Sequence, residues 1–349
     1  MIIFIIVIIG LSLLILGHEA GHFFAAKSFG LKVDEFGFGF PPRIKAWKRG
    51  ETEYSLNWLP FGGFVKLAGE RGEFEMVDGD GAPNAGEDHS RHLYTQPAWK
   101  KSVIMLAGVF MNFILGWLLI SATLMVGAPK ALVITDIQPG SPAAAVGLMS
   151  GDVVKGYTGS QSFIDFVNAH RGATTTVTII RSDKEMSFEV TPRVTTAPNE
   201  GAIGVALAEA GTDRESVPRA LWDGLVSSVM LVGYTFAAFY ELVRQLFTHA
   251  TLLAGVVGPV GIVGVAEETG KIGLTYLLQF IGIVSINLTV VNLIPFPALD
   301  GGRFLLAIIE KIKGSPLSYK VEAWINGLGF AFLILLMVLL TVRDIGALL

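Results

Sequence analysis

The residues most able to do chemistry lie near the amino terminus, in the sequence HEAGH at residues 18–22. On a helix, His18 and His22 share one face, so both imidazoles can reach a single metal ion. Glu19 lies beside them and could accept a proton from zinc-activated water. Three ionisable groups inside an apolar stretch are costly and normally functional, which disfavours two ordinary histidines beside a chance glutamate. The pattern predicts that His18 and His22 bind Zn²⁺ and that Glu19 is the general base.

A third zinc ligand is needed, because a catalytic zinc usually has three protein ligands and one open position. The chain has no cysteine, and its other histidines lie in polar loops or at segment ends. Asp300 is the better candidate, since it follows a long apolar stretch in the sequence NLIPFPALDGG at residues 292–302. Taken alone, Asp300 could simply cap the next helix, at residues 303–311. Taken together with HEAGH, the metal-ligand interpretation is favoured.

Asn292, at the start of the same motif, has two interpretations. Its amide could donate a hydrogen bond to a substrate carbonyl or oxyanion, which would make Asn292 part of a catalytic site. Alternatively, Asn292 simply ends a helix ahead of Pro295. The residues themselves leave both interpretations open.

The composition indicates a membrane protein. Of 349 residues, 52% are hydrophobic and only 16% are charged, whereas a soluble domain has about a quarter of its residues charged. Disorder requires the opposite balance, and a net charge of −4 gives no basic surface for nucleic acid. Four apolar stretches are long enough to cross a bilayer, if the last begins near Val321: residues 2–26, 102–126, 272–299 and 327–342.

Two polar segments lie between these spans. Residues 27–101 mix aromatic and β-branched residues with Gly and Pro turns, which is typical of short strands and hairpins. Residues 131–194 are expected to form a small soluble α/β domain. Lysine and arginine gather after the first span and between the last two, so both of those loops are predicted to be cytoplasmic. The α/β domain and both termini would then lie on the other side.

A further apolar segment, residues 221–247, is predicted not to cross the membrane. A crossing there would reverse the third span and carry Asp300 away from the two histidines with which it must share the metal. It would also place the basic residues at 303–320 outside. We therefore expect a helix that lies in the outer interface or is partly re-entrant.

These motifs resemble the site-2 protease family of intramembrane zinc metalloproteases (M50), and the RseP-type bacterial members most closely. The resemblance covers almost the whole chain. Besides HEAGH and NLIPFPALDGG it includes FGFGF (36–40), PFGGFVKL (60–67), AGVFMNF (107–113), GPVGI (258–262) and DGGRFLLAIIEKIKG (300–314). Two departures stand out. Val109 replaces the usual proline, and residues 128–195 have room for one PDZ-like domain where RseP carries two.

The resemblance implies a zinc metalloprotease of the bacterial inner (cell) membrane, with His18, His22 and Asp300 as ligands and Glu19 as catalytic base. Its substrates would be single-pass transmembrane proteins in the lipid bilayer, such as anti-sigma factors or signal-peptide remnants. Two alternatives are a zinc-binding membrane protein without proteolytic activity and a PDZ scaffold with a vestigial site.

Two further regions could engage a substrate. An unwound substrate segment could add as a β-strand to residues 36–40, which are Phe36, Gly37, Phe38, Gly39 and Phe40. The alternative is that this hairpin is a structural lid. The PDZ-like domain could bind a peptide end or act as a size filter that excludes intact ectodomains.

The expected fold is an α-helical polytopic membrane protein with about four transmembrane helices, a membrane-associated β-hairpin region and an inserted α/β PDZ-like domain. Residues 1–127 would hold the first two spans, HExxH and the cytoplasmic hairpin loop. Residues 128–195 would form the extracytoplasmic PDZ-like domain, and residues 196–270 a linker with an interfacial amphipathic helix. Residues 271–349 would hold the last two spans and the DGG motif, with the active site toward the cytoplasmic side.

Overall fold

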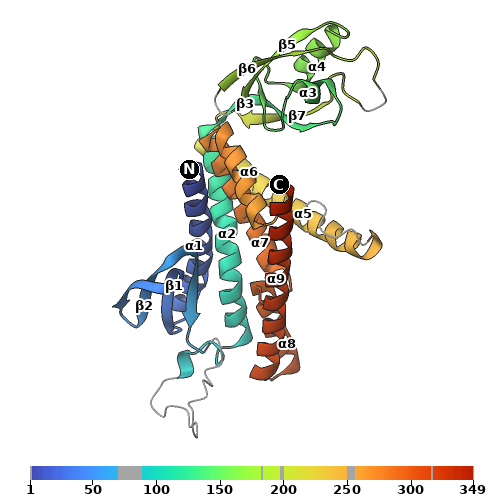
Figure 1. The fold of residues 1–349 in the computed structure, drawn as a ribbon. Helices are drawn as coiled ribbons and strands as arrows, with labels where there is room; N and C mark the ends of the chain where they lie inside the picture. Colours follow the sequence, from blue (N-terminus) through green and yellow to red (C-terminus); the bar gives the residue numbers. More distant parts are fainter. Residues whose placement is uncertain are drawn as a thin grey trace. The chain divides into compact units, whose positions relative to one another are not determined.

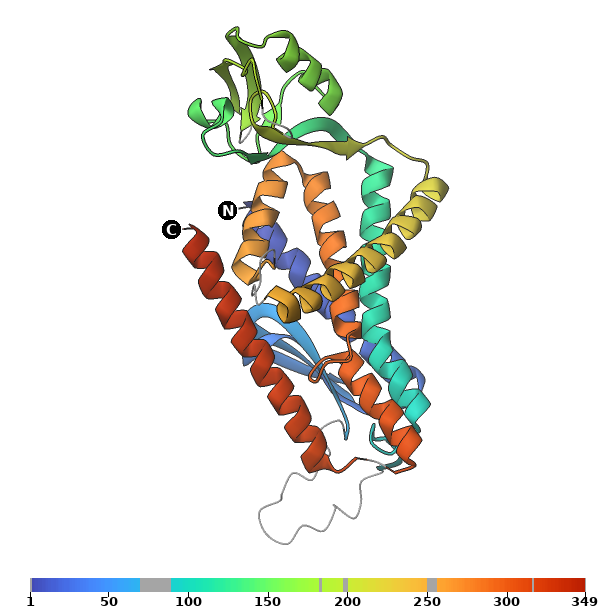
Figure 2. The same cartoon turned by 90° about the vertical axis from the view of Figure 1, so that its right-hand side faces the viewer.

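The computed structural model describes residues 2–69, 89–181, 184–196, 200–249, 256–315 and 317–348. These residues form mostly helices, together with two β-sheets (Figures 1 and 2). The chain divides into two compact units. The first unit comprises Met1–Ile120, Gly224–Gly264 and Ile281–Leu349, and the second comprises Ser121–Asp223 and Val265–Phe280.

Three apolar helices contribute to the centre of the first unit: α1 (Ile2–Ser28), α2 (Ala98–Val126) and α7 (Leu274–Leu293). Glycines lie where these helices approach one another, as is usual for helices that pack in membranes. A Cβ atom at Gly21 of α1 would collide with the backbone of Ala107 and Gly108 in α2. A Cβ atom at Gly116 of α2 would come within 2.6 Å of the Ile286 side chain of α7. The helix that carries HExxH therefore packs directly on the backbone of α2.

Two long strands, β1 (Val33–Arg49) and β2 (Thr52–Leu67), follow α1 and form the predicted hairpin region. Residues 35–38 pair with residues 53–56 on one side and with residues 63–66 on the other. Residues 43–49 pair with the remaining side of residues 52–57. The outer edges of the sheet are therefore residues 43–49 and residues 63–67.

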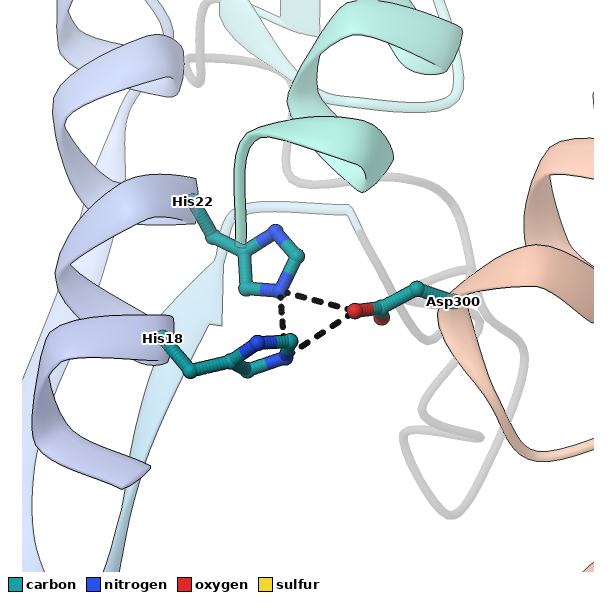
Figure 3. A group of neighbouring side chains, drawn as sticks. All are labelled: His18, His22 and Asp300. Atoms are coloured by element: carbon teal, nitrogen blue, oxygen red, sulfur yellow. Dashed lines mark hydrogen bonds and ion pairs between the residues drawn. The ribbon is translucent and has the colours of Figure 1, made fainter. Parts of the chain in front are cut away.

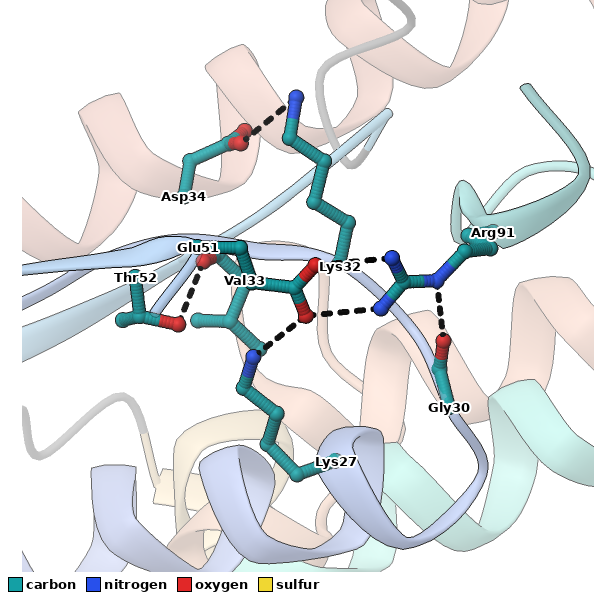
Figure 4. A network of polar contacts seen from close by, with 8 residues as sticks. All are labelled: Lys27, Gly30, Lys32, Val33, Asp34, Glu51, Thr52 and Arg91. Carbon is teal, nitrogen blue, oxygen red and sulfur yellow. Dashed lines mark hydrogen bonds and ion pairs between the residues drawn. The ribbon is translucent and has the colours of Figure 1, made fainter. Parts of the chain in front are cut away.

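A polar network joins the turn of this hairpin to the end of α1 (Figure 4). The Glu51 carboxylate accepts hydrogen bonds from Arg91 at 2.7 and 2.8 Å and from Lys27 at 2.8 Å. Arg91, in the short helix η1 (His89–Arg91), also donates to the Gly30 carbonyl at 2.8 Å. The two cations, Arg91 above all, lower the pKa of Glu51 from 4.5 to about 2. The network fixes the hairpin against the carboxyl-terminal end of the HExxH helix.

The chain leaves α7 through a sharp turn and enters two further helices, α8 (Asp300–Lys313) and α9 (Tyr319–Leu348). Gly301 and Gly302 are buried in the first turn of α8. A Cβ atom at either glycine would collide with backbone atoms of residues 293–297. The diglycine after Asp300 thus lets α8 begin directly against the end of α7.

The segment before α7 contains a long helix. Residues 221–247 do form a helix, α5 (Val217–His249), but its length and composition also suit a membrane span. Among the described residues, five helices meet that criterion, one more than the predicted four.

A second helix there, α6 (Pro259–Ile272), was expected to be linker. The backbone N–H groups of Gly258 and Gly261 at its start donate to the Asp344 carboxylate of α9, at 3.4 and 2.8 Å. Because the capping residue, Asp344, is distant in sequence, no local pattern marks the start of α6.

The second unit contains a five-stranded antiparallel sheet in the order β6-β5-β4-β3-β7. Its strands are β3 (Ala128–Ile137), β4 (Val153–Val154), β5 (Thr175–Arg181), β6 (Lys184–Val190) and β7 (Val205–Thr212). Two helices, α3 (Pro142–Ala145) and α4 (Ser160–Ala169), pack against the sheet. The core between them includes Phe163 of α4, Leu132 of β3 and Ile179 of β5. The sheet extends beyond the predicted boundary at residue 195. Its pairing of β3 with the distant β7 could not be read from local patterns.

Candidate metal centre

His18 and His22 project from one face of α1 toward Asp300 at the start of α8 (Figure 3). Their Nε2 atoms lie 3.2 Å apart, and Asp300 Oδ2 lies 3.0 Å from His18 Nε2 and 3.3 Å from His22 Nε2. Within the described part of the chain, these residues form the one cluster of three side chains that could hold a metal ion. The three residues predicted as zinc ligands therefore come together.

The size of this triangle fits a tetrahedral metal ion. Zinc bonds to nitrogen and oxygen of about 2.0–2.2 Å place two tetrahedral ligand atoms roughly 3.3 Å apart. The three separations, between 3.0 and 3.3 Å, are close to that value. Three protein ligands also leave the fourth position open, as in catalytic zinc sites.

The chemistry of the donor atoms fits a cation as well. His22 Nδ1 lies 2.8 Å from the Ile104 carbonyl oxygen, so Nδ1 carries the ring proton and donates it. In the neutral ring, His22 Nε2 then presents a lone pair to the cluster. Asp300 Oδ2 is buried and has no hydrogen bond of acceptable geometry. Electron-pair donors that face one another this closely in a buried site are stabilised by a metal ion.

Asp300 does not cap α8. The N-cap residue is Leu299, and Asp300 occupies the first position of the helix with its carboxylate directed at the histidines. Asp300 is therefore not the N-cap residue, and its role as a zinc ligand stays a prediction.

Glu19 contacts the neighbouring sheet. Its Oε2 atom accepts a hydrogen bond from the backbone N–H of Val65 at 3.1 Å. Val65 belongs to residues 63–67, the edge of the sheet next to α1. The bond orders a carboxylate that directly follows His18 in sequence, and the role of Glu19 as general base stays a prediction.

Helix α2 packs against both imidazoles of the site. A Cβ atom at Gly108 would overlap the imidazoles of both His22 and His18. The Asn112 amide lies 3.2 Å from His18 Nδ1. The sequence prediction gave neither residue a role. The available signal was a glycine and an asparagine four residues apart in an uncharged span, within AGVFMNF.

The residues predicted to contact the substrate are Asn292 and residues 36–40. Asn292 lies in the last turn of α7, where the predicted helix end was expected, and its role as a donor remains a prediction. Residues 35–38 are paired on both sides within the sheet, so Phe36–Phe38 offer no free backbone edge. Strand addition beside Glu19 would have to use residues 63–67 instead. Residues 36–38 of FGFGF pair with that edge strand from inside the sheet.

A cluster of two histidines and an aspartate in a unit of apolar helices is typical of a membrane metalloenzyme. The profile of peptidase family M50 matches residues 6–336, and the chain belongs to this family. It is 30% identical to the regulator of sigma-W protease RasP of Bacillus subtilis, with 95% of each chain covered. It is 32% identical to the zinc metalloprotease RasP of Geobacillus kaustophilus, again over 95% of each chain. The protein is thus a zinc metalloprotease and a multi-pass membrane protein.

Proposed function

We propose that this protein is an intramembrane protease that cleaves the transmembrane segments of single-pass, membrane-anchored proteins. Anti-sigma factors and signal-peptide remnants are the substrate classes that we favour. The observation that carries the proposal is the His18, His22 and Asp300 cluster, in a unit built largely of apolar helices. The name of one relative, regulator of sigma-W protease, supports a regulatory substrate.

In this mechanism His18, His22 and Asp300 hold the zinc ion. Zinc, when bound, supplies a Lewis acid that polarises the scissile carbonyl and makes water easier to deprotonate. Glu19 accepts the proton of the attacking water and later donates it to the leaving amide nitrogen. The hydrogen bond from Val65 holds the Glu19 carboxylate in place for both transfers. The Asn292 amide donates to the carbonyl oxygen as negative charge develops there.

The substrate segment must be extended before it can react, because the peptide bonds of a transmembrane helix are shielded by their own hydrogen bonds. The edge at residues 63–67 can pair with such a strand through its backbone groups other than the Val65 N–H, which donates to Glu19, and so replace some of the bonds lost on unwinding. A Cβ atom at Gly63 would lie 3.7 Å from the Glu19 side chain, so this edge runs past the catalytic carboxylate. Residues 36–40 then support the edge from within the sheet.

The sheet domain of the second unit would select substrates. A cavity of about 410 Å³ lies between α4 and the edge strand β7. Phe163 and Val167 of α4 and Val205 and Leu207 of β7 line it with apolar side chains. A peptide end could add to β7 there, as peptides do in PDZ domains. The alternative role, a size filter against intact ectodomains, would not need this cavity.

We place the enzyme in the inner (cell) membrane of a bacterium, with the sheet domain outside and the active site toward the cytoplasmic side. The support is the excess of lysine and arginine in residues 27–101 and 303–320, which favours a cytoplasmic position for both loops.

The proposal is tested by incubating the purified full-length protein, in lipid vesicles, with a single-pass substrate that carries tags on both sides of its transmembrane segment. We expect cleavage within that segment, loss of cleavage on chelation and recovery with added zinc. His18→Ala and Asp300→Ala should lose bound zinc and cleavage together. Bound zinc without cleavage of any such substrate would favour a non-proteolytic zinc-binding protein or a PDZ scaffold with a vestigial site. Normal zinc affinity in Asp300→Ala would remove Asp300 from the ligand set.

A further inference from the structure

Helix α2 meets the two imidazoles of HExxH along a single face. Ile104, Gly108 and Asn112 are spaced four residues apart, so they lie on one side of the helix. The Ile104 carbonyl accepts from His22, Gly108 leaves room for both rings, and the Asn112 amide lies against His18. Each imidazole therefore has its own hydrogen-bonding partner on α2.

The partner of His18 matters because a histidine binds a metal through only one of its two ring nitrogens. His18 Nε2 faces Asp300 and His22, at 3.0 and 3.2 Å. A neutral ring that binds zinc through Nε2 must carry its proton on Nδ1. That Nδ1–H group needs an acceptor in the buried site, and the neighbouring side chain is Asn112.

The Asn112 amide can supply this acceptor by a half turn. In the structure, Nδ2 is the atom 3.2 Å from His18 Nδ1, and Oδ1 is buried without a hydrogen-bond partner. Oxygen and nitrogen of an amide have nearly the same size, so the turn exchanges them without moving any other group. Oδ1 then accepts from His18 Nδ1–H at an ordinary hydrogen-bond distance. Without this turn, the Nδ2–H group donates to His18 Nδ1, which requires a neutral ring that carries its proton on Nε2.

Asn112 is also held firmly enough to orient a ring. Asn112 is only 1% exposed. Its backbone carbonyl accepts a hydrogen bond from the Ser285 hydroxyl of α7 at 2.8 Å. The packing of α2 on α7 thus fixes Asn112 by contacts that do not involve the metal ligands.

We infer that Asn112 is a positioning residue for the metal site, whose amide oxygen accepts from His18 Nδ1–H and holds Nε2 toward the zinc ion. The inference rests on the proposed ligation of zinc by His18. Hydrogen-bond partners of this kind typically contribute roughly tenfold to a hundredfold to metal affinity.

The test measures zinc affinity of the full-length protein by competition with a chromogenic chelator. Asn112→Leu keeps a similar volume but has no acceptor, and we expect it to bind zinc roughly 10- to 100-fold more weakly. Asn112→Asp keeps an acceptor in the same place and loses the donor, so it should bind zinc about as tightly as the unsubstituted protein. If Asn112→Leu does not fold, Asn112→Ala provides the same comparison without added apolar bulk.

Ser228→Ala is the matched control, since it removes a buried hydrogen bond, from the Ser228 hydroxyl to the Gly224 carbonyl at 2.7 Å, that involves neither Asn112 nor a metal ligand. Its zinc affinity should be unchanged. The visible spectrum of the Co²⁺-substituted protein gives a second reading. We expect the tetrahedral bands to change in Asn112→Leu and to be preserved in Asn112→Asp and Ser228→Ala.

Equal losses of affinity in Asn112→Leu and Asn112→Asp would overturn the inference, because the amide would then act as a donor. Unchanged affinity in Asn112→Leu would overturn it too, since the contact would be packing alone. His18→Ala separates this result from the proposed function. If His18→Ala binds zinc normally, the ligand assignment itself fails, and the role of Asn112 fails with it.

Discussion

At the scale of single residues, the metal centre depends on a position that has no side chain. Gly108 of α2 lies so close to His18 and His22 that a methyl group would overlap both rings. Neither ring can move away freely, because His22 is bonded to Ile104 and His18 contacts Asn112. The smallest possible substitution should therefore disturb the geometry of the ligands.

We predict that Gly108→Ala lowers zinc affinity by roughly tenfold or more and lowers cleavage with it. Gly233→Ala in α5 is the matched control, since nothing lies within 4 Å of a Cβ atom there. Because alanine favours helix over glycine, the control should keep its zinc and gain up to about 1 kcal/mol in stability. Zinc affinity in Gly108→Ala equal to that of the control would show that the rings adjust freely.

How far the site could be predicted also differs residue by residue. The i, i+4 spacing of His18 and His22 is a local pattern, so the sequence was sufficient for that pair. Asp300 required a second motif and the condition that both motifs meet on one side of the membrane. The contacts of Val65 and Asn112 depend on how a sheet edge and a second helix pack on α1. No local pattern encodes that packing, and neither contact was predicted.

At the scale of elements, the Glu51 network joins the hairpin to α1 and makes its docking depend on pH. The pKa of Glu51 is lowered to about 2 in the folded protein, against an ordinary value of 4.5. A carboxyl group with a lowered pKa contributes stability above its unfolded pKa. The contribution is lost as the pH falls from about 4.5 toward 2.

We predict that Glu51→Gln lowers the unfolding free energy at pH 7 by roughly 1 kcal/mol. This is less than the pKa shift alone implies, because the Glu51 side chain is 35% exposed and solvent screens its ion pairs. The measurement is thermal unfolding in detergent at several pH values. The difference from the unsubstituted protein should shrink below about pH 4.5 and be nearly lost at about pH 2, and Glu189→Gln, on exposed strand β6, should show no difference. If Glu51→Gln lowers the unfolding free energy as much at low pH as at pH 7, the ion pairs of Glu51 are not the cause of the loss.

The elements that were predicted are those with a strong local pattern. The apolar runs that became α1, α2 and α7 and the hairpin between the first two helices were all expected. Helix α6 and strand β7 were missed for one shared reason. The start of α6 is capped by Asp344, and β7 is completed by β3, each far away along the chain.

At the scale of the whole molecule, the membrane topology depends on the path of α5. Figure 2 shows α5 running obliquely across α2. Within the first unit, Thr235 of α5 donates to Asn287 of α7 at 2.8 Å. The chain then reaches Gly258 and Gly261, which bond to Asp344 near the end of α9. That end of α9 lies opposite the basic loop at 303–320. We predict that α5 dips into the membrane and returns on the same side.

We predict that single cysteines at Thr212 and Thr269 both react with an impermeant reagent applied to intact cells. The chain has no cysteine of its own, so each label reports one position. Ser315→Cys, between α8 and α9, should be protected until the membrane is permeabilised. Labelling at Thr212 with protection at Thr269 would mean that α5 crosses completely, and the shared zinc site would have to be abandoned.

We predict that the sheet domain can be removed without loss of the metal centre, because His18, His22 and Asp300 all lie in the first unit. The deletion should take out residues 128–212, since a cut at residue 194 would leave β7 without its partner β3. Zinc content and cleavage of a short, pre-trimmed substrate should survive, while a substrate with its full ectodomain should be rejected less strongly. Loss of zinc on deletion would make the domain part of the catalytic fold.

The central claim is that three side chains hold zinc while a fourth, Glu19, moves the proton. Zinc content and substrate cleavage, measured together on purified Glu19→Gln, test it most directly. Glutamine keeps the shape of the side chain but cannot accept the proton, and the ligands His18, His22 and Asp300 are untouched. The expected result is zinc bound as in the unsubstituted protein with cleavage abolished. Cleavage at the normal rate by Glu19→Gln would contradict the mechanism.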